Sequence, residues 1–226
     1  QLQTDPAALD GLGLQGWGGL RLALPLEQDS DATNLAAEAV ASAAAPAGAP
    51  VTAGMGAVSR LIGGAPELAD PKADTALDAL ADASDPATSP VHGVVTTEQR
   101  LFQRAASLPD AKSKLAAWLP PGPAAIADFP TALLAGDWLA QEQLTAASEF
   151  ARFMRKPEQL SELAKAGFRV EGGTPPASDV VDFAPVAAPL NIGDNALRAT
   201  IADTLTTPAE SSTVTIMLDQ SMPVDE

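Results

Sequence analysis

A polar run beginning at Glu27 holds the side chains of this sequence that are best suited to bind a small ligand. It opens an expected helix, and a helix N-terminus offers unpaired N–H groups that, with nearby hydroxyls, can bind a carboxylate or another oxyanion. The acids of the run oppose such an anion and favour a neutral or cationic solute instead. Ordinary capping of the helix is the competing interpretation. The candidate ligand-binding residues are Ser30, Asp31, Thr33 and Asn34.

A second candidate pair, Asp137 and Trp138, follows an apolar stretch that is expected to form a buried strand. An indole ring can serve as a platform for a sugar or an amine, and Trp17 has the same capacity, although anchoring the core is the alternative role for both. The single histidine, His92, is expected to be a hydrogen-bonded loop residue rather than a catalytic one. The many carboxylates include no pair whose spacing marks a glycosidase acid and base. The sequence therefore predicts no catalytic residue, and a carboxylate hydrolase is the weakest alternative.

Composition excludes several classes of function. The 226 residues carry 13 Lys and Arg against 29 Asp and Glu, a net charge of −16, which argues against nucleic acid and against an anionic membrane surface as partners. The absence of cysteine excludes disulfides and thiolate metal sites, and one histidine excludes a multi-histidine zinc site. With 47 alanines and only nine aromatic residues, the core is expected to be Leu, Val and Ala. We therefore expect an acidic α/β module without a cofactor of its own.

Hydrophobic periodicity divides the chain into many helices and a few short strands. Leucines at every second position from Leu20 to Leu26 are typical of a half-buried strand, and further strands are expected at 91–95, 131–135 and 212–218. A capping-box pattern, Thr96 with Gln99, predicts a helix beginning there. The other expected helices run from 32 to before Pro46, from 52 to 62, and over 71–81, 110–119, 141–155, 157–166 and 194–205. Residues 171–189, rich in Pro, Gly and Ala, read as an extended connector.

Two stretches give the chain a resemblance to type 2 extracellular solute-binding proteins. The first is Phe129-Pro-Thr-Ala-Leu-Leu-Ala-Gly-Asp-Trp-Leu followed by the helix to Met154, then Lys156-Pro-Glu-Gln-Leu and Ala166-Gly-Phe-Arg. The second is the leucine strand with Asp29-Ser-Asp-Ala-Thr-Asn opening a helix. Lys156 stands where that family usually has serine. The resemblance covers roughly residues 15–170, and it implies that the residues after Asp29 face a cleft between two lobes.

The last stretch resembles the first strand of a von Willebrand factor A domain. Such domains bind Mg²⁺ through an Asp-x-Ser-x-Ser motif, and Asp219 and Ser221 match its first two positions, whereas Pro223 replaces the third. The resemblance implies that these two residues ligate Mg²⁺ only in a longer parent protein. With both stretches in one chain, the sequence resembles actinobacterial membrane-anchored proteins that fuse a substrate-binding domain to a von Willebrand A domain.

We therefore expect an α/β fold built from a type 2 solute-binding lobe, part of a second lobe, a linker and a terminal strand. The expected division is a solute-binding-like domain over 1–170, a connector with a short helix over 171–210, and the start of a von Willebrand A domain over 211–226. The expected function is non-catalytic capture of a small solute or a cell-envelope component outside the cytoplasm, in a protein anchored through a segment absent from this chain. The alternative is a lobe that has lost its ligand and acts as a protein-interaction scaffold for the von Willebrand A domain.

Overall fold

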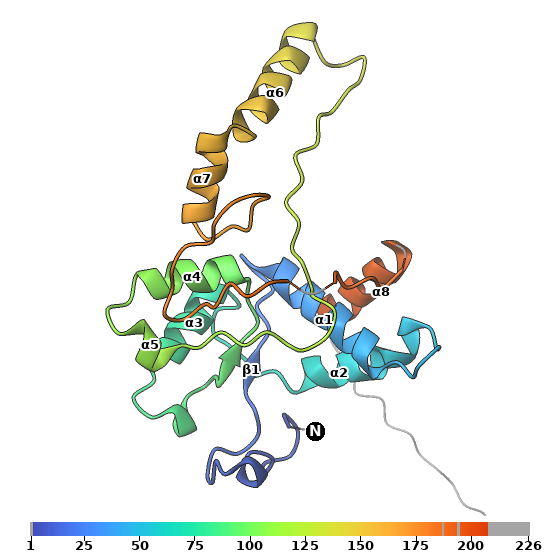
Figure 1. Ribbon diagram of the computed structural model, residues 1–226. Helices are drawn as coiled ribbons and strands as arrows, with labels where there is room; N and C mark the ends of the chain where they lie inside the picture. Colours follow the sequence, from blue (N-terminus) through green and yellow to red (C-terminus); the bar gives the residue numbers. More distant parts are fainter. Residues whose placement is uncertain (1, 187, 194, 208–226) are drawn as a thin grey trace, which may run out of the picture.

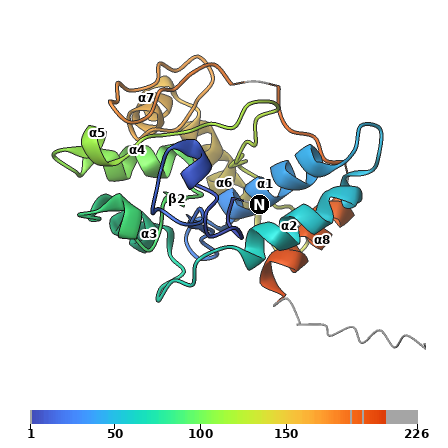
Figure 2. The same cartoon turned by 90° about the horizontal axis from the view of Figure 1, so that it is seen from below.

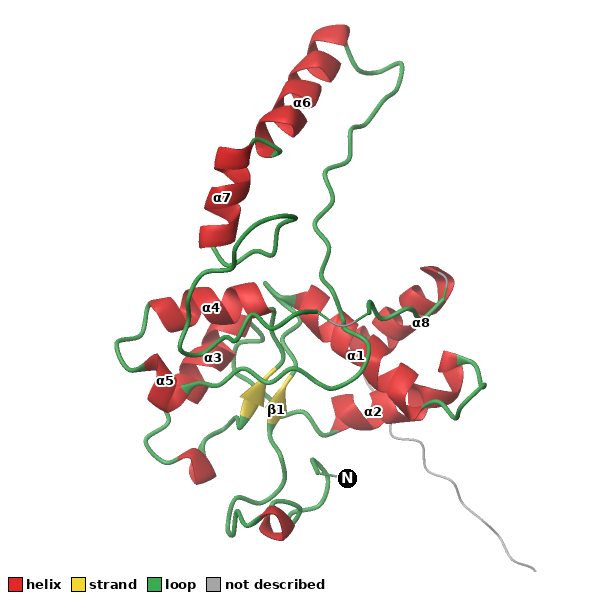
Figure 3. Cartoon of the chain, in the orientation of Figure 1, coloured by secondary structure: helices red, strands yellow, loops and turns green. Residues whose placement is uncertain are grey.

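Two short parallel strands lie at the centre of a mostly helical body. The computed structural model describes residues 2–186, 188–193 and 195–207. Strand β1 (Leu22–Ala23) pairs with β2 (Gly93–Val94), with Leu22 opposite Gly93 and Ala23 opposite Val94, and Figure 3 shows the pair in yellow between the helices. Both lie within stretches predicted as strands, but each strand pairs over two residues only. The chain is therefore mixed α/β, with much less sheet than helix.

Three helices pack together on one side of the strands, as both Figure 1 and Figure 2 show. They are α1 (Ser30–Ala44), α2 (Met55–Gly63) and α8 (Asn195–Thr206), and the short 3-10 helix η2 (Val51–Gly54) precedes α2. Alanines on α1 allow close approach, and larger residues from α2 and α8 fill the space between the helices. The buried residues of this cluster are Ala37, Ala41, Val58, Ile192, Ile201 and Leu205.

A second group of helices covers the other side. It consists of α3 (Ala73–Ala81), α4 (Glu98–Ala106) and the short α5 (Ala111–Lys114). Its core holds Ala81, Ala105, Leu115, Val180 and Val181, and a smaller cluster of Ala23, Ala76 and Val91 lies under the strands. The prediction of a helix over 110–119 is wrong after Lys114. Leu115 adopts an extended backbone conformation and buries its side chain in this core, so tertiary packing ends the helix early.

The helices α6 (Gln141–Met154) and α7 (Pro157–Lys165) project away from this body, and residues 125–140 run beside them (Figure 1). We call residues 118–165 the arm. The predictions of both helices are confirmed: Pro157 stands at the first position of α7, and beyond its end Phe168 N–H donates to the Leu163 carbonyl at 3.0 Å. The predicted buried strand at 131–135 is wrong, because these residues form no strand and are all exposed.

The expected connector packs against the body over much of its length. Val180 and Val181 are buried against the second group of helices, and Ile192 is buried against the first. The helix predicted over 194–205 is confirmed as α8. Residues 211–226, including the predicted strand at 212–218, Asp219 and Ser221, lie outside the described residues. The remaining 3-10 helices are η1 (Asp10–Leu12) and η3 (Pro86–Thr88), and no helix within the described residues is long and apolar enough to span a membrane.

Candidate functional site

The two parallel strands bring the N-termini of α1 and α4 to the same edge of the sheet. The carboxyl end of β1 leads through Asp29 into α1, and the carboxyl end of β2 leads through Thr97 into α4. Parallel α/β sheets bind their ligands at this edge, outside the carboxyl ends of adjacent strands. The ligand-binding residues predicted at the start of α1 therefore lie at this edge, which is the first candidate site.

A carboxylate of the chain already occupies the space between these helix N-termini. Asp29, only 6% exposed, accepts hydrogen bonds from the Thr96 hydroxyl at 2.6 Å and from the Thr97 N–H at 2.9 Å. The Arg100 guanidinium lies 3.7 Å from the same oxygen, and it also pairs with Asp74 at 2.9 Å. Because the carboxylate already meets these donors, the position is filled by an internal anion and disfavours an anionic ligand.

The predicted ligand-binding residues of α1 lie together, but the polar groups of two of them, Thr33 and Asn34, are engaged within the helix and its entry. The buried Thr33 hydroxyl donates to the Pro25 carbonyl at 2.5 Å. The Asn34 amide donates to the Ser30 carbonyl at 2.8 Å, one helical turn back. Asp31 is exposed in the first turn of α1. These bonds are of the kind expected for residues that fix the start of a helix.

The other predicted pair lies far from this edge. Asp137 and Trp138 are in the turn that leads into α6, at the outer end of the arm, whereas α1 is in the body (Figure 1). Both side chains are exposed, and that of Trp138 is 70% exposed. The structure therefore does not bring Asp137 and Trp138 to the residues of α1.

At the opposite edge of the strands, Arg21 and His92 form a pair that sequence reasoning missed. The Arg21 guanidinium lies 2.5 Å from His92 Nε2 and donates to the Ala87 carbonyl at 2.5 Å, while the Trp17 ring lies 5.1 Å from the imidazole. Both ring nitrogens of His92 face donors, because the Arg21 backbone N–H lies 3.3 Å from Nδ1, and this arrangement favours the neutral imidazole, which alone has an acceptor nitrogen. Burial, with the Arg21 charge, lowers the pKa of His92 below its usual value. This pair ties the N-terminal segment to the body and resembles no metal or nucleophile site.

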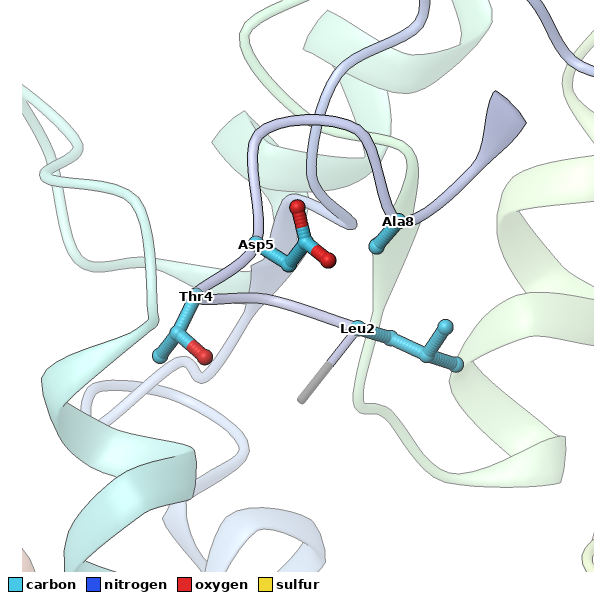
Figure 4. Close-up of a pocket in the computed structure, with 4 residues that line it drawn as sticks. All are labelled: Leu2, Thr4, Asp5 and Ala8. Carbon is cyan, nitrogen blue, oxygen red and sulfur yellow. The ribbon is translucent and has the colours of Figure 1, made fainter. Parts of the chain in front are cut away.

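The N-terminal segment forms a hollow of about 430 Å³. Figure 4 shows the four side chains that line it. Its lining residues are Leu2, Thr4, Asp5 and Ala8, all from one short stretch of chain. The one carboxylate in that lining, Asp5, already accepts the Ala7 N–H at 2.9 Å. Among the described residues, no cluster of three or more His, Cys, Asp or Glu is placed to hold a metal ion. The hollow thus offers few directed polar contacts to a ligand.

The most unusual surface of the molecule is the arm. Of the thirteen exposed large hydrophobic residues in the described part of the chain, nine lie between 118 and 153. They include five of the nine aromatic residues of the whole sequence. The nine are Trp118, Leu119, Ile126, Phe129, Leu133, Leu134, Trp138, Phe150 and Phe153. Helix α6 is exposed over most of its surface, and Ala151 is its one buried residue.

The arm is joined to its base by a few specific contacts. The Phe129 ring meets Phe168 edge-on at 6.0 Å, and the Lys156 ammonium lies 5.7 Å from the Phe153 ring. At its base, Arg169 forms a two-point ion pair with Glu98 of α4, at 2.6 and 2.9 Å. These contacts hold the base of the arm on the body while its outer apolar residues stay exposed.

Comparison with known proteins gives relatives without an assigned role. Two uncharacterized proteins of Mycobacterium tuberculosis, from strains CDC 1551 / Oshkosh and ATCC 25618 / H37Rv, are each 58% identical to this chain over 225 residues. The match covers 100% of this chain and 33% of each relative, so the chain spans about a third of the length of the curated relatives it matches. No family model matches the chain, and no solved structure matches it significantly.

Proposed function

We propose that this chain is a non-catalytic protein-interaction module and that the arm is its interaction element. The observation that carries the proposal is the gathering of five exposed aromatic side chains between residues 118 and 153, in a chain with nine aromatics in all. Contiguous exposed apolar patches beyond a few hundred Å² mark interaction sites in soluble proteins. Aromatic residues are also enriched in the cores of protein interfaces.

The energetics favour a partner that covers this surface. Burying a large apolar side chain stabilises a structure by roughly 1.5–3 kcal/mol, so the five aromatics of the arm leave a substantial gain unused while they are exposed. The charge of the arm supports the same interpretation. The arm, residues 118–165, contains six acids and four bases, whereas the whole chain has a net charge of −16. A nearly neutral apolar surface on a strongly acidic protein suits a protein partner.

Site-specific photo-crosslinking tests this proposal. Benzoylphenylalanine is introduced at Phe150 of α6 or, as the matched control, at Leu12 of the body, which is also exposed. Each probe is placed at the aligned position of the full-length M. tuberculosis H37Rv relative, which is produced in mycobacterial cells and irradiated, and cross-links to another protein or within the same polypeptide are identified by mass spectrometry. We expect a discrete protein adduct from Phe150, suppressed by Phe153→Glu, and none from Leu12. Equal adducts from both positions, or none from Phe150, would contradict an interaction role for the arm.

Solute binding is the second candidate, and one observation favours it: the N-termini of α1 and α4 meet at the carboxyl ends of parallel strands, where α/β proteins bind ligands. Under this second proposal, the body is a lobe like those of type 2 solute-binding proteins. It lies outside the cytoplasm, in a protein anchored to the membrane through a segment absent from this chain. A thermal-shift panel of sugars, amino acids, polyamines and peptidoglycan fragments tests it. A ligand at about 100 times its Kd adds roughly 2.7 kcal/mol of stability. A shift lost in Asn34→Ala supports this candidate, and no shift with any solute contradicts it.

A further inference from the structure

Residues 125–135 cross the arm without a backbone hydrogen bond to any other described residue. The stretch is anchored at its start, where Ala124 exchanges hydrogen bonds with Ala188 and Leu190 at 2.9 and 2.8 Å, and it leads into a turn in which Leu139 N–H donates to the Gly136 carbonyl at 3.0 Å. Figure 1 shows it running from the body to the outer end of the arm. A row of free N–H and C=O groups held in this way is a template for pairing with a β-strand.

The side chains of this stretch suit a strand in a buried sheet. Ile126, Phe129, Leu133 and Leu134 are all exposed. The five residues 131–135 contain no glycine, proline or charge, and Pro130 directly before them can precede a paired strand without removing one of its donors. The sequence of 131–135 is thus typical of a strand with both faces covered, whereas no strand of the described residues pairs with it.

We propose that residues 131–135 add as a β-strand to the open edge of a sheet formed by polypeptide outside residues 1–226 in the same longer protein. This inference rests on the proposed function, since it names the partner of the arm. Strand addition supplies affinity through main-chain hydrogen bonds and specificity through alternate side chains. The exposed aromatics of α6 then pack on one face of the completed sheet.

Two observations favour a partner in the same polypeptide over a second copy of this chain. The relatives match all of this chain and are about three times as long, so they contain further sequence in which such a sheet can lie. A second copy carries the same net charge of −16, and two such bodies repel each other when brought together. A partner linked within one chain meets the arm at a high effective concentration.

Hydrogen exchange of the arm amides tests strand addition. It is measured on residues 1–226 alone and on the full-length M. tuberculosis H37Rv relative, at the positions that align with 131–135. We expect fast exchange in residues 1–226 and exchange at least about 100-fold slower in the full-length relative, because paired amides open only when the strand detaches. Fast exchange in both proteins would overturn the inference.

Proline substitutions separate backbone pairing from contact between side chains. Adjacent N–H groups of a strand point to opposite sides, so Ala132 and Ala135, three positions apart, direct theirs to different sides. We expect Ala132→Pro and Ala135→Pro to leave the Tm of residues 1–226 unchanged, since neither position donates a backbone hydrogen bond there. At the aligned positions of the full-length relative, proline at one of the two should restore fast exchange in the arm, and serine at the same position should not. No effect of either proline contradicts strand pairing.

The other outcomes separate this inference from the proposed function. If the arm aromatics become protected from radical labelling in the full-length relative while the amides still exchange fast, strand addition is wrong and the interaction role stands. If neither is protected and no adduct forms from Phe150, both are wrong. If residues 1–226 form a dimer in which the arm is protected, the partner is a second copy of the chain. That result overturns the proposed partner, while the interaction role of the arm stands.

Discussion

The carboxylate of Asp29, the N-cap residue of α1, accepts the backbone N–H of Thr97, the N-cap residue of α4, at 2.9 Å. This bond spans 68 positions of sequence and fixes the two helix N-termini against each other at one edge of the strands. The Asp29 carboxylate also takes up the hydrogen-bond donors at these helix N-termini that could otherwise bind a ligand. For this reason the apolar arm, rather than the helix N-termini, carries the proposed function.

Removing the Asp29 carboxylate should destabilise the body. Asp29→Ala leaves the Thr96 hydroxyl, the Thr97 N–H and part of the Arg100 charge without their acceptor, and we expect a loss of about 2–3 kcal/mol in the free energy of unfolding. Asp31→Ala is the matched control, because Asp31 is exposed two residues later, and it should cost less than about 1 kcal/mol. Urea unfolding at pH 7 measures both. Equal losses would show that Asp29 does not tie the helices together.

Glu38 is a buried carboxylate on α1, 6% exposed. Burial raises its pKa above the ordinary value of 4.5, and Arg198, at 3.8 Å, opposes this shift only in part. Below pH 4.5 the carboxyl is neutral in both the folded and the unfolded chain, and stability falls as the pH rises through the raised folded pKa. Glu38→Gln should therefore be more stable than the unmodified chain at pH 7 and equal to it near pH 4.

Arg198→Gln is the converse variant, because it removes the cation that lies 3.8 Å from that carboxylate. It should lower stability at pH 7, where Glu38 is ionised, and have little effect near pH 4. Urea unfolding of both variants at the two pH values checks the pair, at micromolar concentration because the pI is about 4.2. A loss of stability in Glu38→Gln at pH 7 would show that the charged pair, and not burial, dominates.

His92 should make the body less stable in mild acid. Its pKa is lowered by burial and by the Arg21 charge, so the unfolded chain binds a proton at His92 more readily than the folded one. Stability therefore rises with pH between the lowered folded pKa and the ordinary value of 6.5, and is constant with respect to this group above it. His92→Gln should flatten that part of the stability profile. A slope that survives the substitution would assign the pH dependence to other groups.

Gly167 is required where α7 ends on the body. Its φ is +92°, in the left-handed region, and a Cβ there would lie 2.6 Å from Cδ1 of Phe102. Gly167→Ala should cost about 2–4 kcal/mol, from backbone strain and from the clash. Gly172→Ala separates the two effects, because Gly172 also has a positive φ of +68° but nothing within 4 Å of the added Cβ, and it should cost about 1 kcal/mol. Similar losses for both, by thermal unfolding, would rule out the contact with Phe102.

Local sequence signals predicted the helices well. Proline at the start of α7, glycine after its end and the apolar period of α6 act within a few residues, and the structure confirms both helices. The start of α4 was predicted one residue early, since Thr97 rather than Thr96 caps it by accepting the Arg100 N–H at 3.2 Å. Thr96 instead donates to Asp29, a contact across 67 positions that no local pattern contains.

Long-range partners account for the errors. The stretch 131–135 has the composition of a buried strand, but a strand needs a neighbour, and the described residues provide none. The candidate residues Thr33 and Asn34 were correctly placed together at a helix N-terminus, yet the bond of Thr33 to Pro25 depends on the path of the chain into α1, and Asn34 bonds back to Ser30 within the helix. Asp137 and Trp138 are separated from them because the arm extends away from the body.

The most direct test of the account is hydroxyl-radical footprinting of the aromatic side chains of residues 1–226 in dilute solution. The account predicts that Trp138 and Phe150, 70% and 60% exposed, are modified several times faster than Phe102 and Phe183, which pack against the second core. If the modification rates of Trp138 and Phe150 do not change with protein concentration, these side chains are not buried between two copies of the chain. Slow modification of Trp138 and Phe150, equal to that of Phe102, would mean that the arm lies folded on the body, and would contradict the claim that its apolar surface is free to bind a partner.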